Sequence, residues 1–255
     1  MILLVDVGNS NICFGISDKI NIIQTYRFKT FLDKTSDEYY LLFKEMLSEY
    51  HIDDIIISSV VPIVTSALIK LFKKFLNIEA KVVAPKLKTG IKVKVDDPKT
   101  VGSDMICDCV GALKYSSTAL IIDLGTATKY IYMKDNTFMG CSISPGISIS
   151  MKALANEAAL LPNIELIKPE KVISTNTINC MQSGLIYGAH AQIDGMIELI
   201  KKEIKNNDIK IIATGGLSSL IIPMSKHQII LDANLTLLGL QEIYKKNLGD
   251  WLWYS

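Results

Sequence analysis

The chain reads LLVDVGNSN at residues 3–11 and LIIDLGTAT at residues 120–128, and this repetition decides the fold. In both stretches an apolar run predicts a buried strand, which ends at an aspartate and a turn of glycine and small polar residues. Asp6 and Asp123 lie about half the chain apart. We therefore expect an α/β protein in which one unit is duplicated, with a hairpin of this kind in each half.

The order of the predicted elements supports the duplication. In both halves, strands separated by short polar breaks are followed by amphipathic helices. The boundary is expected in KYSST, so the predicted domains are residues 1–115 and 116–255. Ser36 is a plausible cap of the first helix, and Gly184 and Gly188 are possible breaks or close-packing points in the longest one. The main helices are expected at residues 36–50, 64–76, 147–160, 177–205 and 235–247.

Composition excludes several functional classes. The 27 basic and 26 acidic side chains nearly balance, so no electrostatic argument supports a nucleic-acid or membrane partner. No apolar run reaches the length of a membrane helix and no basic leader is seen, so we expect a cytoplasmic protein. The five cysteines are an odd number without a CxxC pair, so we expect buried, reduced thiols and no zinc site.

The two turns have the composition of phosphate-binding loops. Glycine lets the backbone approach a phosphate closely, and small polar side chains add hydrogen bonds without bulk. An aspartate at the mouth of each turn can hold Mg²⁺ or its waters. Ordinary hairpins with polar turns are the alternative for either stretch alone, but the repetition favours phosphate binding. The candidates are Gly8, Asn9, Ser10 and Asn11 in the first turn, and Gly125, Thr126 and Thr128 in the second.

A third glycine-containing stretch, IIATGGLSSLI, ends a hydrophobic strand at Thr214, Gly215 and Gly216. Its surface lacks side chains and could accept the sugar and base of a nucleotide; a turn whose glycines serve packing is the alternative. The chain contains neither GxxxxGK[ST] nor GxGxxG, so the phosphate site would not use a P-loop lysine.

Several stretches in order resemble the type III pantothenate kinase family, which belongs to the acetate and sugar kinase, Hsp70 and actin superfamily. The resemblance implies two actin-like (ribonuclease H-like) lobes with mixed sheets around a nucleotide cleft. It also implies ATP-dependent phosphorylation of pantothenate to 4′-phosphopantothenate, the first step of coenzyme A biosynthesis. The matching stretches are DVGNSN, RFKT, TSDEYY, ISSVVP, DDPKTVGSD, IDLGTATK, ISPGIS, NTINCMQSGLIYG, IDGMI, ATGGLSSLI and LTLLGLQEIY.

The resemblance also implies roles for individual residues. Asp104 would be the catalytic residue, Asp6 would lie near Mg²⁺, and Asp123 would hold a monovalent cation, K⁺ or NH₄⁺. Thr177 would contact the substrate of the partner subunit in a homodimer; a helix cap is the alternative. ATP would contact Asp6, Val7, Gly8, Asn9, Ser10, Asn11, Ile12, Cys13, Thr126, Gly215 and Gly216. The acceptor would contact Gly102, Ser103, Asp104, Met105 and Thr177.

Asp104 would lie in the first turn of a helix that begins after Gly102. There the helix dipole favours an ionised carboxylate, which could orient the attacking hydroxyl in a loose transition state. The alternative is that Asp104 only satisfies the start of the helix. Asp108, one turn later, is interpreted as solvated or structural.

The chain departs from the family pattern on the acceptor side. Met105 replaces an arginine, and Val95 replaces a tyrosine before Asp96-Asp97-Pro98. Losing a charge-assisted contact costs about 1.5 to 3 kcal/mol, roughly ten- to a hundredfold in affinity. Four alternatives stay open: a weakened kinase, another small hydroxylated acceptor, a non-catalytic ATP-binding protein, or compensation by a lysine (Lys92, Lys94 or Lys99).

Overall fold

The computed structural model describes residues 1–248, which form two compact α/β units. Among the described residues, the first unit contains Met1–Lys114, Asn136–Phe138 and residues 234–248, and the second contains Tyr115–Asp135 and Met139–Ala233. The first crossing between the units falls in the predicted KYSST boundary. The units differ from the predicted division of 1–115 and 116–255 because the last helix belongs to the first unit.

The first unit is built on a five-stranded mixed sheet with the order β3-β2-β1-β4-β5. β2 is antiparallel to both β1 and β3, whereas β4 is parallel to both β1 and β5. Its strands are β1 (Ile2–Val7), β2 (Asn11–Ser17), β3 (Ile22–Lys29), β4 (Asp54–Ser59) and β5 (Lys81–Val82). A short strand, β6 (Lys92–Val93), pairs with the first two residues of β9, which also belong to this unit.

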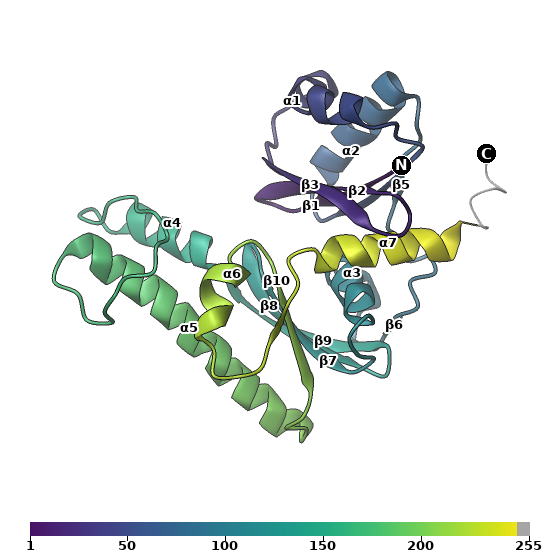
Figure 1. The fold of residues 1–255 in the computed structure, drawn as a ribbon. Helices are drawn as coiled ribbons and strands as arrows, with labels where there is room; N and C mark the ends of the chain where they lie inside the picture. The colour runs from purple at the N-terminus through teal and green to yellow at the C-terminus, as the bar shows by residue number, and fades with distance from the viewer. Residues whose placement is uncertain (249–255) are drawn as a thin grey trace. The chain divides into compact units, whose positions relative to one another are not determined.

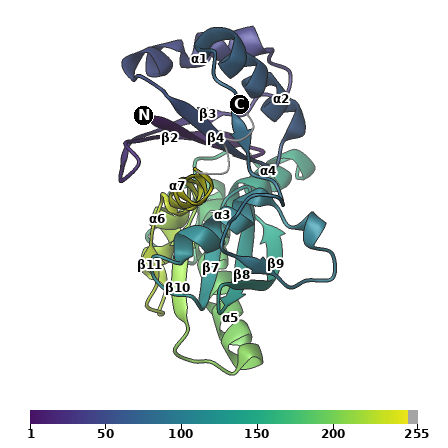
Figure 2. The same cartoon turned by 90° about the vertical axis from the view of Figure 1, so that its right-hand side faces the viewer.

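Helices cover both faces of this sheet (Figures 1 and 2). α1 (Ser36–Glu49) and α2 (Pro62–Leu71) lie on one face, where Leu3 and Val5 join the larger apolar cluster. A π-helical turn, Phe72–Leu76, continues α2. α3 (Ser103–Ala112) and α7 (Leu235–Asn247) pack together on the other face, against Ile2 and Leu4. Successive β1 side chains point to opposite faces, so Asp6 lies on the α3 and α7 face.

The second unit repeats this order of strands, β9-β8-β7-β10-β11. β8 is antiparallel to β7, and β10 is parallel to both β7 and β11. The strands are β7 (Ala119–Leu124), β8 (Ala127–Lys134), β9 (Thr137–Pro145), β10 (Lys210–Thr214) and β11 (Ile230–Leu231). β1 and β7 therefore occupy equivalent places, and Asp6 and Asp123 are each the next-to-last residue of their strand.

Three helices of the second unit share an apolar cluster with its sheet. They are α4 (Ile147–Glu157), α5 (Thr177–Ile204) and α6 (Ser218–Ile221). Leu120, Ile122 and Leu124 of β7 belong to the cluster, so Asp123 points to the opposite face. Two 3₁₀ turns, Pro98–Thr100 and Ile222–Met224, complete the elements described.

Some local predictions were wrong. Thr35, not Ser36, caps α1, in a capping box with Glu38. α5 runs without a break, and a side-chain carbon added at Gly184 or Gly188 would meet nothing within 4 Å. Cys107 and Cys109 are buried as expected, but Cys141 and Cys180 are exposed. Within residues 1–248, no helix is long and apolar enough to cross a bilayer.

Candidate functional site

The turn between β1 and β2 is held by hydrogen bonds within the first unit. The Gly8 N–H donates to the Asn11 carbonyl at 2.9 Å, which closes the turn. From the end of β3, the Thr30 hydroxyl donates to the Gly8 carbonyl at 2.7 Å, and the Thr30 N–H donates to the Ser10 carbonyl at 3.0 Å. Thr30 is buried, and no pattern in the sequence predicts this role for it. The loop geometry is therefore set by the protein itself.

The ATP-binding residues expected in this hairpin have different environments. Val7 and Ile12 are fully buried in the core, so their side chains cannot reach a ligand and only their backbone could. Asn9 is exposed at the tip of the turn. Cys13 lies directly opposite Asp6 in the β1–β2 pair, which places both side chains on one face of the sheet.

The strand end that carries Asp6 and the start of α3, which carries Asp104, lie in one region of the first unit, because Ser103 contacts Ser58 and Ser58 is paired with Asp6. Burial raises the pKa of the Cys107 thiol, and the negative charge of Asp6 raises it further. Asp108 and Asp104 add to the same shift. Carboxylates from β1 and from the first turn of α3 therefore act on one buried thiol of α3. The predicted metal-binding and catalytic aspartates share this region of the unit.

Ser103 fixes the start of α3 against the end of β4. Its Oγ lies 3.1 Å from the Ser58 Oγ and accepts a hydrogen bond from the Ser59 N–H at 3.0 Å. Ser58 is paired with Asp6 in the β1–β4 register. The Ser103 hydroxyl thus positions the helix, and its contact with an acceptor stays a prediction.

The Asp104 carboxylate lies over the first turn of α3. Its Oδ1 accepts a hydrogen bond from the Met105 N–H at 2.8 Å. Gly102 is the N-terminal cap residue and makes no side-chain cap. A Cβ at Gly102 would overlap the Asp104 Oδ1, so glycine at this position makes room for the carboxylate. Asp104 thus accepts a hydrogen bond from an N–H group in the first turn of the helix, and the same hydrogen bond holds its carboxylate in place.

Met105 is 8% exposed, so it packs into the unit as an apolar side chain. Lys92, Lys94 and Lys99 are all exposed. Asp108, which could have been solvated, is instead buried, and its Oδ1 accepts a hydrogen bond from the Thr236 hydroxyl of α7 at 2.6 Å. Asp108 is therefore structural.

In the second hairpin, Asp123 forms an ion pair with a lysine of its own chain. Lys129 lies directly opposite Asp123 in the β7–β8 register. Its Nζ is 2.7 Å from the Asp123 Oδ2, and the two side chains are only 16% and 14% exposed. Sequence reasoning missed this pair because the register of the hairpin depends on the geometry of its turn.

These residues do not fit a separate monovalent cation at Asp123. A potassium ion on the same carboxylate would be repelled by the Lys129 ammonium; two unit charges about 4 Å apart repel by about 4 kcal/mol at an effective dielectric constant near 20. The Asp123 charge is already balanced by an ammonium group that donates a hydrogen bond to it. The predicted K⁺ or NH₄⁺ role of Asp123 therefore conflicts with the side chain opposite it.

Two glycines contact the backbone of the second hairpin. Gly215 has φ +94°, and a Cβ there would lie 2.5 Å from the Leu124 carbonyl carbon. The Gly146 N–H donates to the Thr126 carbonyl at 3.1 Å, and a Cβ on Gly146 would overlap that carbonyl. Gly215 thus serves close packing, whereas Gly216 is exposed. Their contact with a nucleotide stays a prediction.

Thr177 is the first residue of α5 and is exposed. The helix is capped by Asn176, whose side chain accepts a hydrogen bond from the Asn179 N–H at 2.9 Å. The alternative in which Thr177 acts as the cap is therefore wrong, and its hydroxyl lies at the surface of the second unit.

Among residues 1–248, no three His, Cys, Asp or Glu side chains are grouped so that they could hold a metal ion. Mg²⁺ in a kinase does not require such a group, because the ion is usually held by one or two carboxylates, by water and by the phosphates of the substrate. Asp6 could supply one such carboxylate.

Comparisons with a family model and with individual proteins point to the same family. A family model described as type III pantothenate kinase matches residues 2–199. The type III pantothenate kinase of Acholeplasma laidlawii is 44% identical over 248 residues, which cover 97% of this chain and 100% of that protein. The type III pantothenate kinase of Citrifermentans bemidjiense is 42% identical over 254 residues, with coverage of 97% and 100%.

Solved structures support the fold. MreB 5 of Spiroplasma citri, determined with bound AMPPNP, superposes with a TM-score of 0.54 at 11% identity and covers 99% of this chain and 98% of its own. At this identity the likeness concerns the fold alone. It agrees with two mixed-sheet α/β units of the actin-like class.

Proposed function

The chain belongs to the type III pantothenate kinase family, and from this premise we propose that it transfers a phosphoryl group from ATP to the primary hydroxyl of pantothenate. The product would be 4′-phosphopantothenate, and the reaction would be the first step of coenzyme A biosynthesis. The observation that carries the proposal, beside family membership, is that the hydroxyl of Ser103, the residue before Asp104, contacts Ser58, which is paired with Asp6 in the sheet. The cytoplasmic location stays a prediction.

We assign the roles as follows. The turn after β1 binds phosphate through its backbone and small side chains, and Thr126 of the second hairpin also contacts ATP. Asp6 places Mg²⁺, which supplies neutralisation of the phosphate charge when it is bound. Asp104, fixed over the start of α3, orients the acceptor hydroxyl.

Acceptor recognition has to work without the family arginine at position 105. Met105 is buried, so this side chain supplies apolar packing and no charge. We propose that the acceptor carboxylate is bound elsewhere, with the exposed Lys92, Lys94 and Lys99 as candidates. Weaker acceptor binding than in an arginine-containing relative is the expected consequence.

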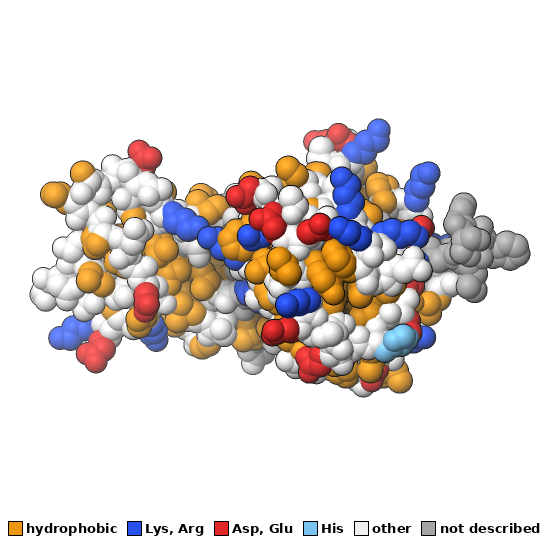
Figure 3. Space-filling model, turned by 90° about the horizontal axis from the view of Figure 1, so that it is seen from above, with side chains coloured by type: hydrophobic (Ala, Val, Ile, Leu, Met, Phe, Trp, Pro, Cys, Tyr) orange, Lys and Arg blue, Asp and Glu red, His pale blue; other side chains and the backbone are white. Residues whose placement is uncertain are grey.

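We also propose a homodimer in which Thr177 of one subunit contacts the acceptor bound to the other. The exposed face near the start of α5 supports it. Gly184 and Gly188 leave open space along the helix, and Ile173 and Val172 are 86% and 65% exposed. Figure 3 shows hydrophobic side chains at the surface of the part of the second unit that carries α4 and the segment after it. Exposed apolar groups of this kind mark interaction surfaces.

The reaction is tested by Asp104→Asn. The amide keeps the shape but cannot accept a proton, so we expect kcat/KM for pantothenate to fall by about 10²- to 10⁴-fold. ATP should still raise the melting temperature of the variant. Asp33→Asn, a change of the same chemistry at an exposed position of the first unit, is the matched control and should keep full activity.

A panel of small hydroxylated acceptors distinguishes the alternatives. ADP release with pantothenate above all other acceptors supports the proposal. Preference for a different acceptor would replace pantothenate but keep the kinase. Stabilisation by ATP with no ADP release from any acceptor would make the chain a non-catalytic nucleotide-binding protein.

A further inference from the structure

The ion pair in the second hairpin distinguishes it from the first. The two hairpins are topological equivalents, and each places an aspartate opposite a β-strand partner. The position opposite Asp6 carries Cys13, which supplies no positive charge. The position opposite Asp123 carries Lys129, which does. The second carboxylate therefore has a permanent cationic partner built into the neighbouring strand.

The Lys129 ammonium has the chemistry expected of a bound monovalent cation. It carries one positive charge and three N–H donors, so it resembles an ammonium ion attached to the chain. Its Nζ already lies at hydrogen-bond distance from the Asp123 carboxylate. Because it belongs to β8, it gives up no translational freedom on occupying this position, whereas a free ion does.

We propose that the Lys129 ammonium permanently takes the place of a monovalent cation at Asp123, which makes the enzyme independent of K⁺ and NH₄⁺. The activity test of this inference rests on the proposed kinase function. The ion-binding test described below does not.

The decisive comparison is between the native chain and Lys129→Met, which keeps the apolar stem and removes the charge. Initial rates are measured in tetramethylammonium chloride and in potassium or ammonium chloride at equal ionic strength. The native enzyme should show the same rate, within about twofold, in all three salts. Lys129→Met should lose roughly ten- to a hundredfold in rate without K⁺ and recover part of it when K⁺ or NH₄⁺ is added.

Lys134→Met is the matched control, because Lys134 is an exposed lysine at the end of the same strand. This variant should behave as the native enzyme in every salt. If Lys129→Met does not fold, as judged by circular dichroism, Lys129→Gln tests the same loss of charge with a side chain that can still donate to Asp123.

A second measurement needs no catalysis. The melting temperature of the protein alone is followed during titration with K⁺ or its analogue Tl⁺, and Tl⁺ binding is observed directly by ²⁰⁵Tl NMR. Only the variant that lacks the Lys129 charge should bind the ion and be stabilised by it.

The outcomes separate the two proposals. A native enzyme that needs K⁺, or a native protein that binds Tl⁺ at this site, would overturn the inference. A native protein that phosphorylates no pantothenate in any salt would refute the proposed function, and the Tl⁺ titration would still decide the role of Lys129.

Discussion

At the residue scale, the backbone contacts of Gly215 explain why the stretch TGG contains a glycine at this position. The TGG stretch suggested a nucleotide surface, with packing as its alternative. The structure gives Gly215 the packing role, because its φ of +94° and its contact with Leu124 both exclude a side chain. That contact joins the loop after β10 to the end of β7, one residue after Asp123. The geometry of the second hairpin therefore depends on a glycine far from it in sequence.

Gly215→Ala should destabilise the protein by about 2 kcal/mol or more, since it combines an unfavourable φ with a clash against the backbone. It should also weaken ATP binding, because the end of β7 has to move. Gly216→Ala is the control. Gly216 is exposed and is not among the glycines with a positive φ, so this change should leave the stability nearly unchanged. Urea unfolding and ATP titration of both variants measure these effects, and equal losses would contradict the assignment.

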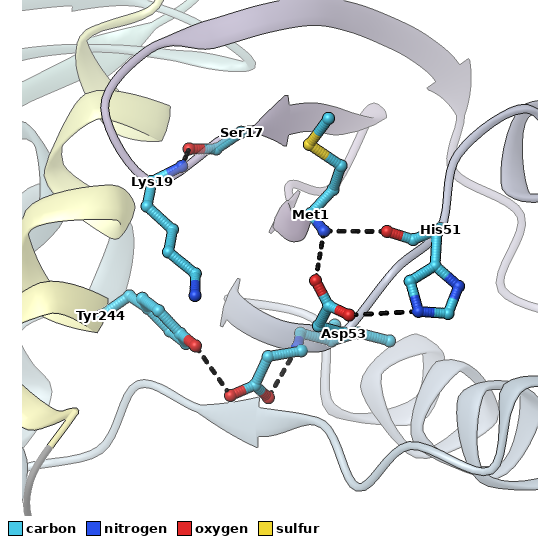
Figure 4. A network of polar contacts seen from close by, with 8 residues as sticks. Met1, Ser17, Lys19, His51, Asp53 and Tyr244 are labelled. Atoms are coloured by element: carbon cyan, nitrogen blue, oxygen red, sulfur yellow. Dashed lines mark hydrogen bonds and ion pairs between the residues drawn. The ribbon is translucent and has the colours of Figure 1, made fainter.

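At the element scale, α7 ends the described chain but completes the first unit. Leu237, Leu240 and Ile243 share a buried cluster with β1 and α3. Near the end of the helix, the Tyr244 hydroxyl donates to the Asp54 Oδ2 at 3.0 Å, at the start of β4 (Figure 4). Asp54 also pairs with Lys81 of β5, so two strands and a helix meet at this carboxylate. Burial raises the pKa of Tyr244, and the negative charge of Asp54 raises it further. The phenol therefore stays protonated, and donates its hydrogen bond, well above neutral pH.

Tyr244→Phe should lower the free energy of unfolding by about 1 to 3 kcal/mol, the range for a hydrogen bond to a charged group. The ring still fills its place, so the m-value should not change. Tyr40→Phe is a control on a half-buried tyrosine of α1 that stacks on Phe75, and it should have a smaller effect. A Tyr244→Phe protein as stable as the native one in urea would show that α7 is held by its apolar face alone.

At the scale of the whole molecule, the proposed homodimer would bury the open face of α5. Gly184→Arg introduces a long charged side chain where the single chain has space, so the fold of one subunit should tolerate it. We expect the variant to be monomeric by light scattering and to lose affinity for the acceptor, because Thr177 would no longer reach the partner's site. Its ATP-induced stabilisation should be kept.

Glu203→Arg is the matched control. It adds the same side chain to the same helix, about 28 Å further along its axis and on a different side. This variant should keep the mass and kinetics of the native protein. A native chain that is monomeric at working concentration, yet fully active, would rule out the shared site.

Local signals made much of the fold predictable. These signals come from residues that are neighbours in sequence: the apolar runs before Asp6 and Asp123, the small turn residues, and the helical periodicity of residues 235–247. The structure confirms the strands and the last helix that they predict. The duplication followed from the same signals. Interactions between distant segments were not predictable, because a hydrophobic pattern shows that a face is buried but not which partner covers it. The placement of α7 in the first unit is an example.

The sequence by itself determined the α/β class, the paired aspartate hairpins, the position of Asp104 in the first turn of α3 and, through its resemblance, the kinase family. Only the tertiary structure decided that Met105 is buried, that Asn176 and not Thr177 caps α5, and that Lys129 neutralises Asp123. The physical reason is that strand register, burial and ion pairing depend on how separate segments meet in space, and these contacts form only when the chain folds.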